Sequence, residues 1–283
     1  MDGPDGVSER VRALIAATGR SQREYAAALG LDETKLSKSL AGRRRFSASE
    51  LVAIARRGGV TVNWLLHGRD DAPTVSAVPA PTTRPARPGG ADPLLGTAWE
   101  LVAARGHHRV DADAIAQAAG TDVATVRLRF PDPGDVLREV LRHSVGLAFD
   151  RQVAGLHGVD DAHERLHHLV ELQLPTEGLL RAEWSVWLQV WTESALDPEL
   201  RSLYWDSYDR WHRTIAMTLR RGQEHGAFRP GDPDETATEL TALIDGLGLQ
   251  VLTGRPGSSV AAMRAHLHDH IARTIVSTAR EGT

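Results

Sequence analysis

Apolar residues recur every three to four positions along most of the 283-residue chain. Val11, Leu14 and Ile15 begin this pattern, which predicts amphipathic helices. No long run alternates between apolar and polar residues, so the pattern does not indicate a β-sheet. Residues 71–92 depart from it, because they are rich in Pro, Ala and Thr and offer almost no large apolar side chain to a core. They predict a linker, and the whole pattern predicts an all-α protein.

Residues 1–70 contain signals for five short helices. Two capping boxes, Ser21 with Glu24 and Ser47 with Glu50, each predict the start of a helix. A tight turn at Gly30 separates the second helix from the third. Two short helices joined in this way are typical of a helix-turn-helix unit, which binds DNA with its second helix.

The third helix, capped by Asp32, turns Leu36 and Leu40 inward and leaves short polar and cationic side chains facing out. Such side chains suit contacts with phosphates and base edges. Residues 1–70 resemble the lambda-repressor/Cro-like (XRE-type) DNA-binding domain. The resemblance implies a DNA-facing set that comprises Gln22, Glu33, Thr34, Lys35, Lys38, Arg43, Arg44 and Arg45. A solvated charged turn is the alternative interpretation of the three consecutive arginines.

A second helix-turn-helix pattern, ADAIAQAAGTDVATVRLRFPDPGDVL, runs from Ala112 to Leu137 within residues 93–145. With the helices after it, this segment resembles the TetR family of repressors, in which such a unit binds DNA. The resemblance implies Thr125, Arg127 and Arg129 as DNA contacts. The family usually has a phosphate-binding lysine where this chain has Pro133. Two interpretations therefore remain: the arginines replace the usual contacts, or the unit is retained as structure and no longer binds DNA.

Residues 146–283 predict a helical domain for effector binding and dimerisation. Two apolar stripes close the chain, and TetR-like proteins build a four-helix dimer interface from such terminal helices. The expected interface residues are Leu240, Ile244, Leu247, Val251, Met263, Leu267 and Ile271. Packing within one chain is the alternative.

Five of the seven tryptophans lie within 28 residues, spaced so that several share a helix face. An aromatic-lined pocket suits planar, apolar or cationic effectors, although aromatic stripes also build ordinary cores. The expected pocket residues are Trp184, Trp187, Trp191, Tyr208 and Trp211.

Charge is unevenly distributed along the chain. Residues 1–70 carry 12 Lys+Arg against 8 Asp+Glu, whereas residues 146–283 carry 13 against 20. Positive charge at the N-terminus suits a polyanionic partner. The chain has no cysteine, no apolar run of the roughly 18 residues that a membrane span needs, and no signal-peptide pattern. These features predict a cytoplasmic protein with no membrane partner.

A competing motif, HERLH at His163–His167, matches the zinc-binding pattern of metalloproteases. No third ligand stands at a convincing spacing. We therefore expect no enzyme, no cofactor and no metal, with a metal-sensing regulator and a zinc hydrolase as alternatives. The preferred interpretation is a homodimeric transcriptional regulator, a repressor, that binds operator DNA and responds to a small-molecule effector.

Overall fold

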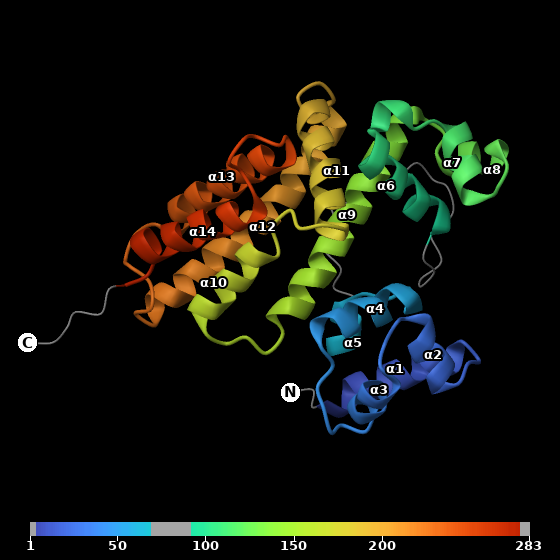
Figure 1. Ribbon diagram of the computed structural model, residues 1–283, viewed down its shortest axis with the longest axis horizontal. Helices are drawn as coiled ribbons and strands as arrows, with labels where there is room; N and C mark the ends of the chain where they lie inside the picture. Colours follow the sequence, from blue (N-terminus) through green and yellow to red (C-terminus); the bar gives the residue numbers. More distant parts are fainter. Residues whose placement is uncertain (1–3, 69–91, 278–283) are drawn as a thin grey trace, which may run out of the picture. The chain divides into compact units, whose positions relative to one another are not determined.

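The computed structural model describes residues 4–68 and 92–277 (Figure 1). Regular structure in these residues is helical, apart from one isolated bridge between Phe228 and Val276. The prediction of an all-α protein is therefore confirmed. The predicted linker lies outside the described residues except for Asp92. The chain divides into two compact units: the first groups the helices before the predicted linker with residues 146–157, and the second groups residues 94–145 with the residues from 158 onward.

The first unit contains five helices between residues 4 and 68. They are α1 (Pro4–Ala17), α2 (Gln22–Ala28), α3 (Glu33–Leu40), α4 (Ala48–Gly58) and α5 (Val62–His67). Both predicted capping boxes are present, at Ser21 with Glu24 and at Ser47 with Glu50. Asp32 caps α3 by accepting a hydrogen bond from the Lys35 amide. Local hydrogen bonding in the sequence thus sets where these helices begin.

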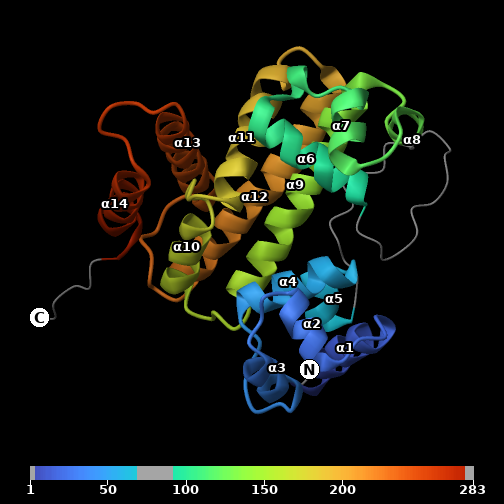
Figure 2. The same cartoon turned by 45° about the vertical axis from the view of Figure 1, so that its right-hand side comes forward.

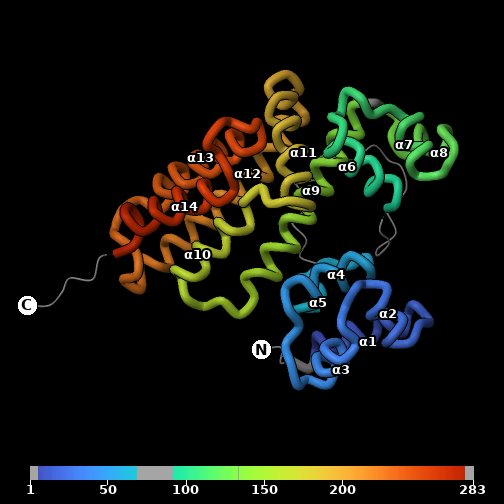
Figure 3. Tube along the Cα trace, in the orientation of Figure 1, coloured from blue at the N-terminus to red at the C-terminus, as the bar shows by residue number. Residues whose placement is uncertain are grey.

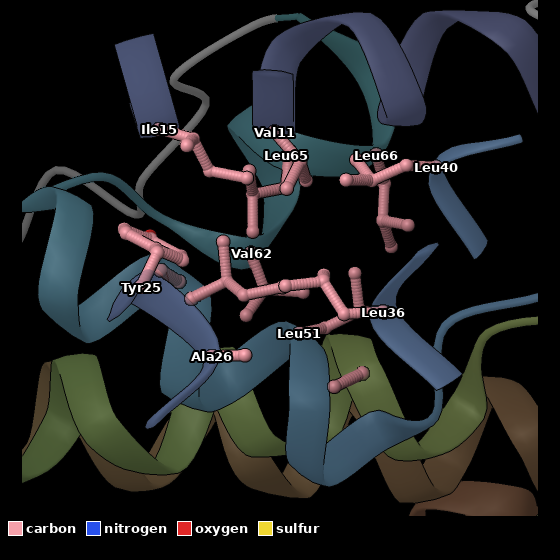
Figure 4. Packing of buried hydrophobic residues seen from close by; sticks show 13 residues of the cluster. Val11, Ile15, Tyr25, Ala26, Leu36, Leu40, Leu51, Val62, Leu65 and Leu66 are labelled. Carbon is pink, nitrogen blue, oxygen red and sulfur yellow. The ribbon is translucent and has the colours of Figure 1, made fainter. Parts of the chain in front are cut away.

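A single apolar cluster holds α1–α5 together, as Figure 4 shows. Leu36 from α3 and Leu51 from α4 are both almost fully buried, and Tyr25 of α2 lies in the same cluster. Val11 contributes from α1 and Leu65 from α5. Burying Leu36 and Leu40 leaves the opposite face of α3 exposed, as the sequence pattern predicts.

The second unit contains the remaining helices. They are α6 (Pro93–Arg105), the 3-10 turn η1 (His107–Arg109), α7 (Ala112–Ala119), α8 (Val123–Arg129), α9 (Pro133–Leu156), α10 (Ala162–Glu171), α11 (Leu179–Ser194), α12 (Pro198–Glu224), α13 (Pro233–Leu252), α14 (Val260–His270) and the π-helical turn η2 (Ile271–Ile275). Asp122 caps α8, and Asp232 caps α13 directly before a first-turn proline.

Packing in the second unit centres on the long helix α12, which contacts α10, α11 and α13 (Figure 3). The last two helices, α13 and α14, lie side by side (Figure 2). Helix α11 also packs against α13. None of the described helices is long and apolar enough to cross a membrane.

Candidate effector site and DNA-binding surfaces

Aromatic side chains from α11 and α12 form a continuous cluster. Tyr204 contacts three rings, with centroid distances of 6.1 Å to Trp187, 5.0 Å to Trp205 and 5.6 Å to Tyr208. Trp205 also meets Tyr208 edge-on at 5.8 Å. Trp205 remains 50% exposed, so the cluster reaches the surface and is not wholly core. Offset and edge-on contacts of this kind leave ring faces available for a ligand.

A second aromatic pair lies deeper. Trp184 and Trp191 meet edge-on with centroids 6.0 Å apart. Trp184 is buried, and its indole N–H donates to the Gln173 carbonyl at 2.8 Å. Its ring packs against the backbone of α13 at Gly248, where a Cβ atom would come within 2.1 Å of the ring. Trp184 is therefore a core residue that joins α11 to α13.

Asp245 brings a carboxylate into this aromatic environment. It projects from α13, and its Oδ2 accepts a hydrogen bond of 2.9 Å from the Tyr208 hydroxyl. Burial raises the pKa of Asp245 to about 6, although the hydrogen bond from Tyr208 favours the ionised form. A carboxylate with this pKa is ionised at neutral pH and provides negative charge among the rings.

The same surroundings affect the two tyrosines. Burial raises the pKa of Tyr204 to about 12, and the neighbouring Asp245 charge acts in the same direction. Burial also raises the pKa of Tyr208. Both phenols are therefore neutral at physiological pH, so Asp245 supplies the charge of the cluster. A cation would find ring faces and a carboxylate together here.

The structure thus brings together Trp187 and Tyr208 of the expected pocket residues, and places Trp184 and Trp191 in the adjacent deeper pair. Trp211 is half-buried on α12, about one turn beyond Tyr208. Tyr204 and Trp205 belong to the same aromatic-rich segment but were not among the expected pocket residues, and sequence reasoning missed Asp245 altogether. An available signal was the single acidic residue within the otherwise apolar run LTALIDGLGL of α13.

In the first unit, the predicted DNA-facing residues of α3 are exposed. Thr34, Lys35 and Lys38 all lie on the surface, as does Glu33, which is 3.8 Å from Arg23. Gln22, at the start of α2, is half-buried. The outer face of α3 therefore offers two lysines to a polyanion.

The three consecutive arginines of this unit are not equivalent. Arg43 and Arg45 are exposed, whereas Arg44 forms an ion pair of 2.5 Å with the buried Glu50. Glu50 is also the carboxylate of the second capping box. Burial opposes its ionisation, but hydrogen bonds from Arg44 and Ser47 outweigh this and hold the pKa of Glu50 below its ordinary value. Arg44 consequently has a structural partner of its own.

In the second unit, α8 leaves only one of its two arginines exposed, although the sequence predicts both as DNA contacts. Thr125 and Arg127 are exposed. Arg129 is half-buried, pairs with Glu139 at 3.1 Å and lies over the Phe130 ring at 4.7 Å. Between them Leu128 is 84% exposed, which the sequence analysis did not single out.

The terminal apolar stripes are largely internal. Five of the expected interface side chains are buried within the chain itself: Leu240, Ile244, Met263, Leu267 and Ile271. They fill the core of the second unit and are not available for a contact between copies. Leu247 and Val251 are half-buried and line a small pocket at the α13–α14 connection. The exposed face in this part of α13 is instead formed by Ala242, Gly246 and Leu249, and the C-cap Thr253 after the helix is also exposed.

The HERLH histidines lie on α10, where His163 and His167 have ring centroids 4.4 Å apart. His167 also meets His268 of α14 at 4.5 Å. Glu171, 3.3 Å from His268, is paired with Arg264 at 2.8 Å. Within the described residues, the group of side chains spaced to hold a metal ion lies elsewhere, at η1.

A helix-turn-helix unit followed by a helical body is an architecture typical of transcriptional regulators. Residues 162–276 match the family described as BetI-type transcriptional repressor, C-terminal. The regulator BetI from Burkholderia lata is 28% identical over 162 residues, which cover 56% of this chain and 79% of that protein.

Solved structures extend the comparison to about two thirds of the chain. A transcriptional regulator from Saccharomonospora viridis, crystallised in complex with choline, is 61% identical; the match covers 66% of this chain and 97% of that one, with a TM-score of 0.65. A TetR-family regulator from Rhodococcus sp. shares the fold at 23% identity and a TM-score of 0.58, covering 64% of this chain and 96% of that one. The chain belongs to the TetR family of transcriptional regulators, in its BetI type.

Proposed function

We propose that this regulator is a repressor that binds operator DNA as a homodimer and responds to a quaternary ammonium effector of the choline type. The observation that carries the effector class is the placement of Asp245 beside Tyr208 within the aromatic cluster. A trimethylammonium group has no N–H donor, so ring faces and a nearby carboxylate are the groups that recognise it best. The choline complex of the Saccharomonospora viridis regulator supports this assignment.

Direct binding measurements test the effector class. Calorimetric titration of the full-length protein with choline is compared with titration by 3,3-dimethylbutanol, which has the same shape without the charge. We expect choline to bind, the neutral analogue to bind at least about 10-fold more weakly, and Asp245→Asn to weaken choline binding about 10- to 100-fold. Asp209→Asn, an exposed change on the same α12 that carries Tyr208, is the matched control. Equal binding of choline and its neutral analogue would exclude a charge-selective site.

The XRE-like interpretation of residues 1–70 supplies a DNA-binding surface on α3. Lys35 and Lys38 are exposed there, on a helix whose apolar side is fully used by the core. The helix-turn-helix of the second unit adds Thr125 and Arg127 on α8. Arg129 forms an ion pair with Glu139, and Arg44 forms one with Glu50. We therefore assign these two arginines a mainly structural role. The proposed contacts are Lys35 and Lys38 of α3 and Thr125 and Arg127 of α8.

Footprinting on the promoter region of its own gene tests both surfaces in the full-length chain. Lys35→Ala with Lys38→Ala removes the cations of α3, and Thr125→Ala with Arg127→Ala removes the polar contacts of α8. Per protomer, loss of the two lysine contacts of α3 should lower the slope of log affinity against log salt by about 2, and loss of the single arginine contact of α8 should lower it by about 1. Arg56→Ala with Arg57→Ala, exposed cations at the end of α4, is the control. If only the α3 variant loses protection of the promoter DNA, α8 has a structural role and does not contact DNA.

Dimerisation is assigned to the exposed faces of α13 and α14. Ala242, Gly246 and Leu249 recur at helical spacing on α13, and Ala261 and Ala265 do so on α14. Small side chains let helices of two copies approach closely, and TetR-like proteins pair through terminal helices. An effector that favours one arrangement of the dimer changes the separation of the paired DNA-binding helices and so lowers affinity for both half-sites.

A further inference from the structure

Two adjacent histidines in the connection between α6 and α7 face a glutamate near the end of α11. The Nε2 atoms of His107 and His108 lie 3.6 Å and 3.3 Å from Glu193 Oε1. The three ligand atoms all lie within 4.8 Å of one another. In the described part of the chain, this trio is the one group of His, Asp and Glu side chains that meets this spacing.

A glutamine orients the inner histidine of this trio. Gln189 Oε1 accepts hydrogen bonds from the His107 backbone amide at 2.6 Å and from its ring Nδ1 at 3.1 Å. An amide oxygen only accepts, so Nδ1 carries the proton and Nε2 keeps its lone pair toward Glu193. Gln189 is itself held, because its Nε2 donates to the carbonyls of Val102 and Ser185. Histidine ligands of metals are commonly fixed by such a second hydrogen bond.

The spacing fits a metal ion better than a simple ion pair. Ligands at about 2.0–2.1 Å from a tetrahedral zinc ion lie roughly 3.3–3.4 Å from each other. The observed separations of 3.3 and 3.6 Å are close to this value and are longer than ordinary hydrogen bonds. His108 is 75% exposed, which leaves solvent access for a water ligand.

We propose that His107, His108 and Glu193 bind a divalent transition-metal ion such as Zn²⁺, with water completing the coordination. The ion would join η1, next to the helix-turn-helix, to the end of α11 in the effector domain. Two imidazoles and one carboxylate with an open position are a common zinc ligand set. The site does not involve the aromatic cluster or the HERLH histidines. It therefore stands independently of the effector and DNA-binding roles proposed above.

Metal binding by the full-length, tag-free protein tests the proposal. Titration with Zn²⁺ alone should show one ion per chain and raise the melting temperature. Co²⁺ should give the visible absorption bands of a low-symmetry, four-coordinate site. His108→Ala and Glu193→Gln should each weaken Zn²⁺ binding at least about 10-fold and abolish the cobalt spectrum. Because His108 is largely exposed, His108→Ala should leave the metal-free melting temperature unchanged.

Two control variants test whether zinc binds at the proposed site or at other histidines. His225→Ala removes an exposed histidine at the end of α12 and should change nothing. His167→Ala removes the central ring of the α10–α14 histidine group and should also leave Zn²⁺ affinity unchanged. The proposal is overturned if the wild-type protein binds no stoichiometric zinc, or if His167→Ala abolishes binding while His108→Ala does not.

Discussion

The ring of Trp184 occupies the space that a side chain at residue 248 would fill. Three of its ring carbons lie 2.1, 2.5 and 2.6 Å from the position of a Cβ atom on Gly248. The indole is rigid, buried and anchored by its hydrogen bond to Gln173, so it cannot rotate away cheaply. Gly248 therefore sets how closely α11 and α13 pack.

Gly248→Ala should destabilise the protein by about 1–3 kcal/mol, because the added methyl group forces the two helices apart. Chemical denaturation followed by tryptophan fluorescence measures this. The control is Gly146→Ala in α9, where a Cβ atom meets nothing within 4 Å. That change should be neutral or stabilise by roughly 0.5–1 kcal/mol, because alanine favours helix. Equal effects of the two substitutions would show that the close packing is not under strain.

Arg44→Ala should lower stability as well as any DNA affinity, because it leaves the buried Glu50 carboxylate without its cation. Exposed Arg45→Ala is the control and should leave stability unchanged. Denaturation at neutral pH should show a loss of about 1–3 kcal/mol for Arg44→Ala only. The folded-state pKa of Glu50 is lowered, so its contribution is present at neutral pH and is lost as pH falls through that pKa. An unchanged midpoint for Arg44→Ala would contradict the structural role.

Choline affinity should depend on pH through Asp245. Its pKa is about 6, so the carboxylate that attracts the cation forms as pH rises through that value. Binding should therefore strengthen between about pH 5 and pH 7.5, and in Asp245→Asn it should be weak and independent of pH over that range. Calorimetry in matched ionic strength measures both curves. A parallel rise in the variant would assign the pH dependence to another group.

The same carboxyl group should affect stability with the opposite trend. Its folded-state pKa of about 6 lies above the ordinary value of 3.8. The stabilising contribution is complete below the unfolded pKa and is lost as pH rises through about 6, a change on the order of 3 kcal/mol. Without effector, the stability of Asp245→Asn relative to wild type should therefore increase between about pH 4 and pH 7. A constant difference would mean that the pKa of Asp245 is ordinary.

Leu249→Glu should weaken self-association, because it places a charge on the exposed face of α13 where copies are proposed to meet. Leu249 is 37% exposed, so the folded chain tolerates the change. Sedimentation over a range of concentrations measures the shift toward monomer. Leu196→Glu, at an 80% exposed apolar residue after α11, is the control and should leave association unchanged. If both variants remain dimers, the interface lies elsewhere.

Local signals in the sequence predicted much of the fold. Ser21, Asp32 and Asp232 each act on the next few residues, so helix starts could be placed from the sequence alone. Periodicity also marked Leu240 and Leu267 correctly as members of apolar faces. It could not say whether those faces pack within one chain or between two, because an apolar stripe has the same pattern in both cases. The structure shows both side chains buried inside the chain.

The candidate sites depend on contacts that sequence spacing does not reveal. Tyr208 and Asp245 meet across 37 positions, and His107 meets Glu193 across an even longer interval. Arg44 and Glu50 are close in sequence, but the sequence does not show that Glu50 is buried and pairs with Arg44. The run of three arginines was therefore interpreted as a DNA-binding surface. Residue types thus indicated an aromatic site and a basic surface, while the acidic partners emerged only from tertiary packing.

Helix α13 has an inner face that packs within the chain and an outer face that we propose for subunit pairing. Its inner face carries Asp245 into the aromatic cluster and Gly248 against Trp184, and its outer face carries Ala242, Gly246 and Leu249. If a substitution on the inner face adapts the site to a new ligand by tilting or shifting α13, the outer face moves with it. Changes at the two faces should therefore show epistasis, with the effect of one depending on the other. Ligand preference and subunit pairing in such a protein would evolve together.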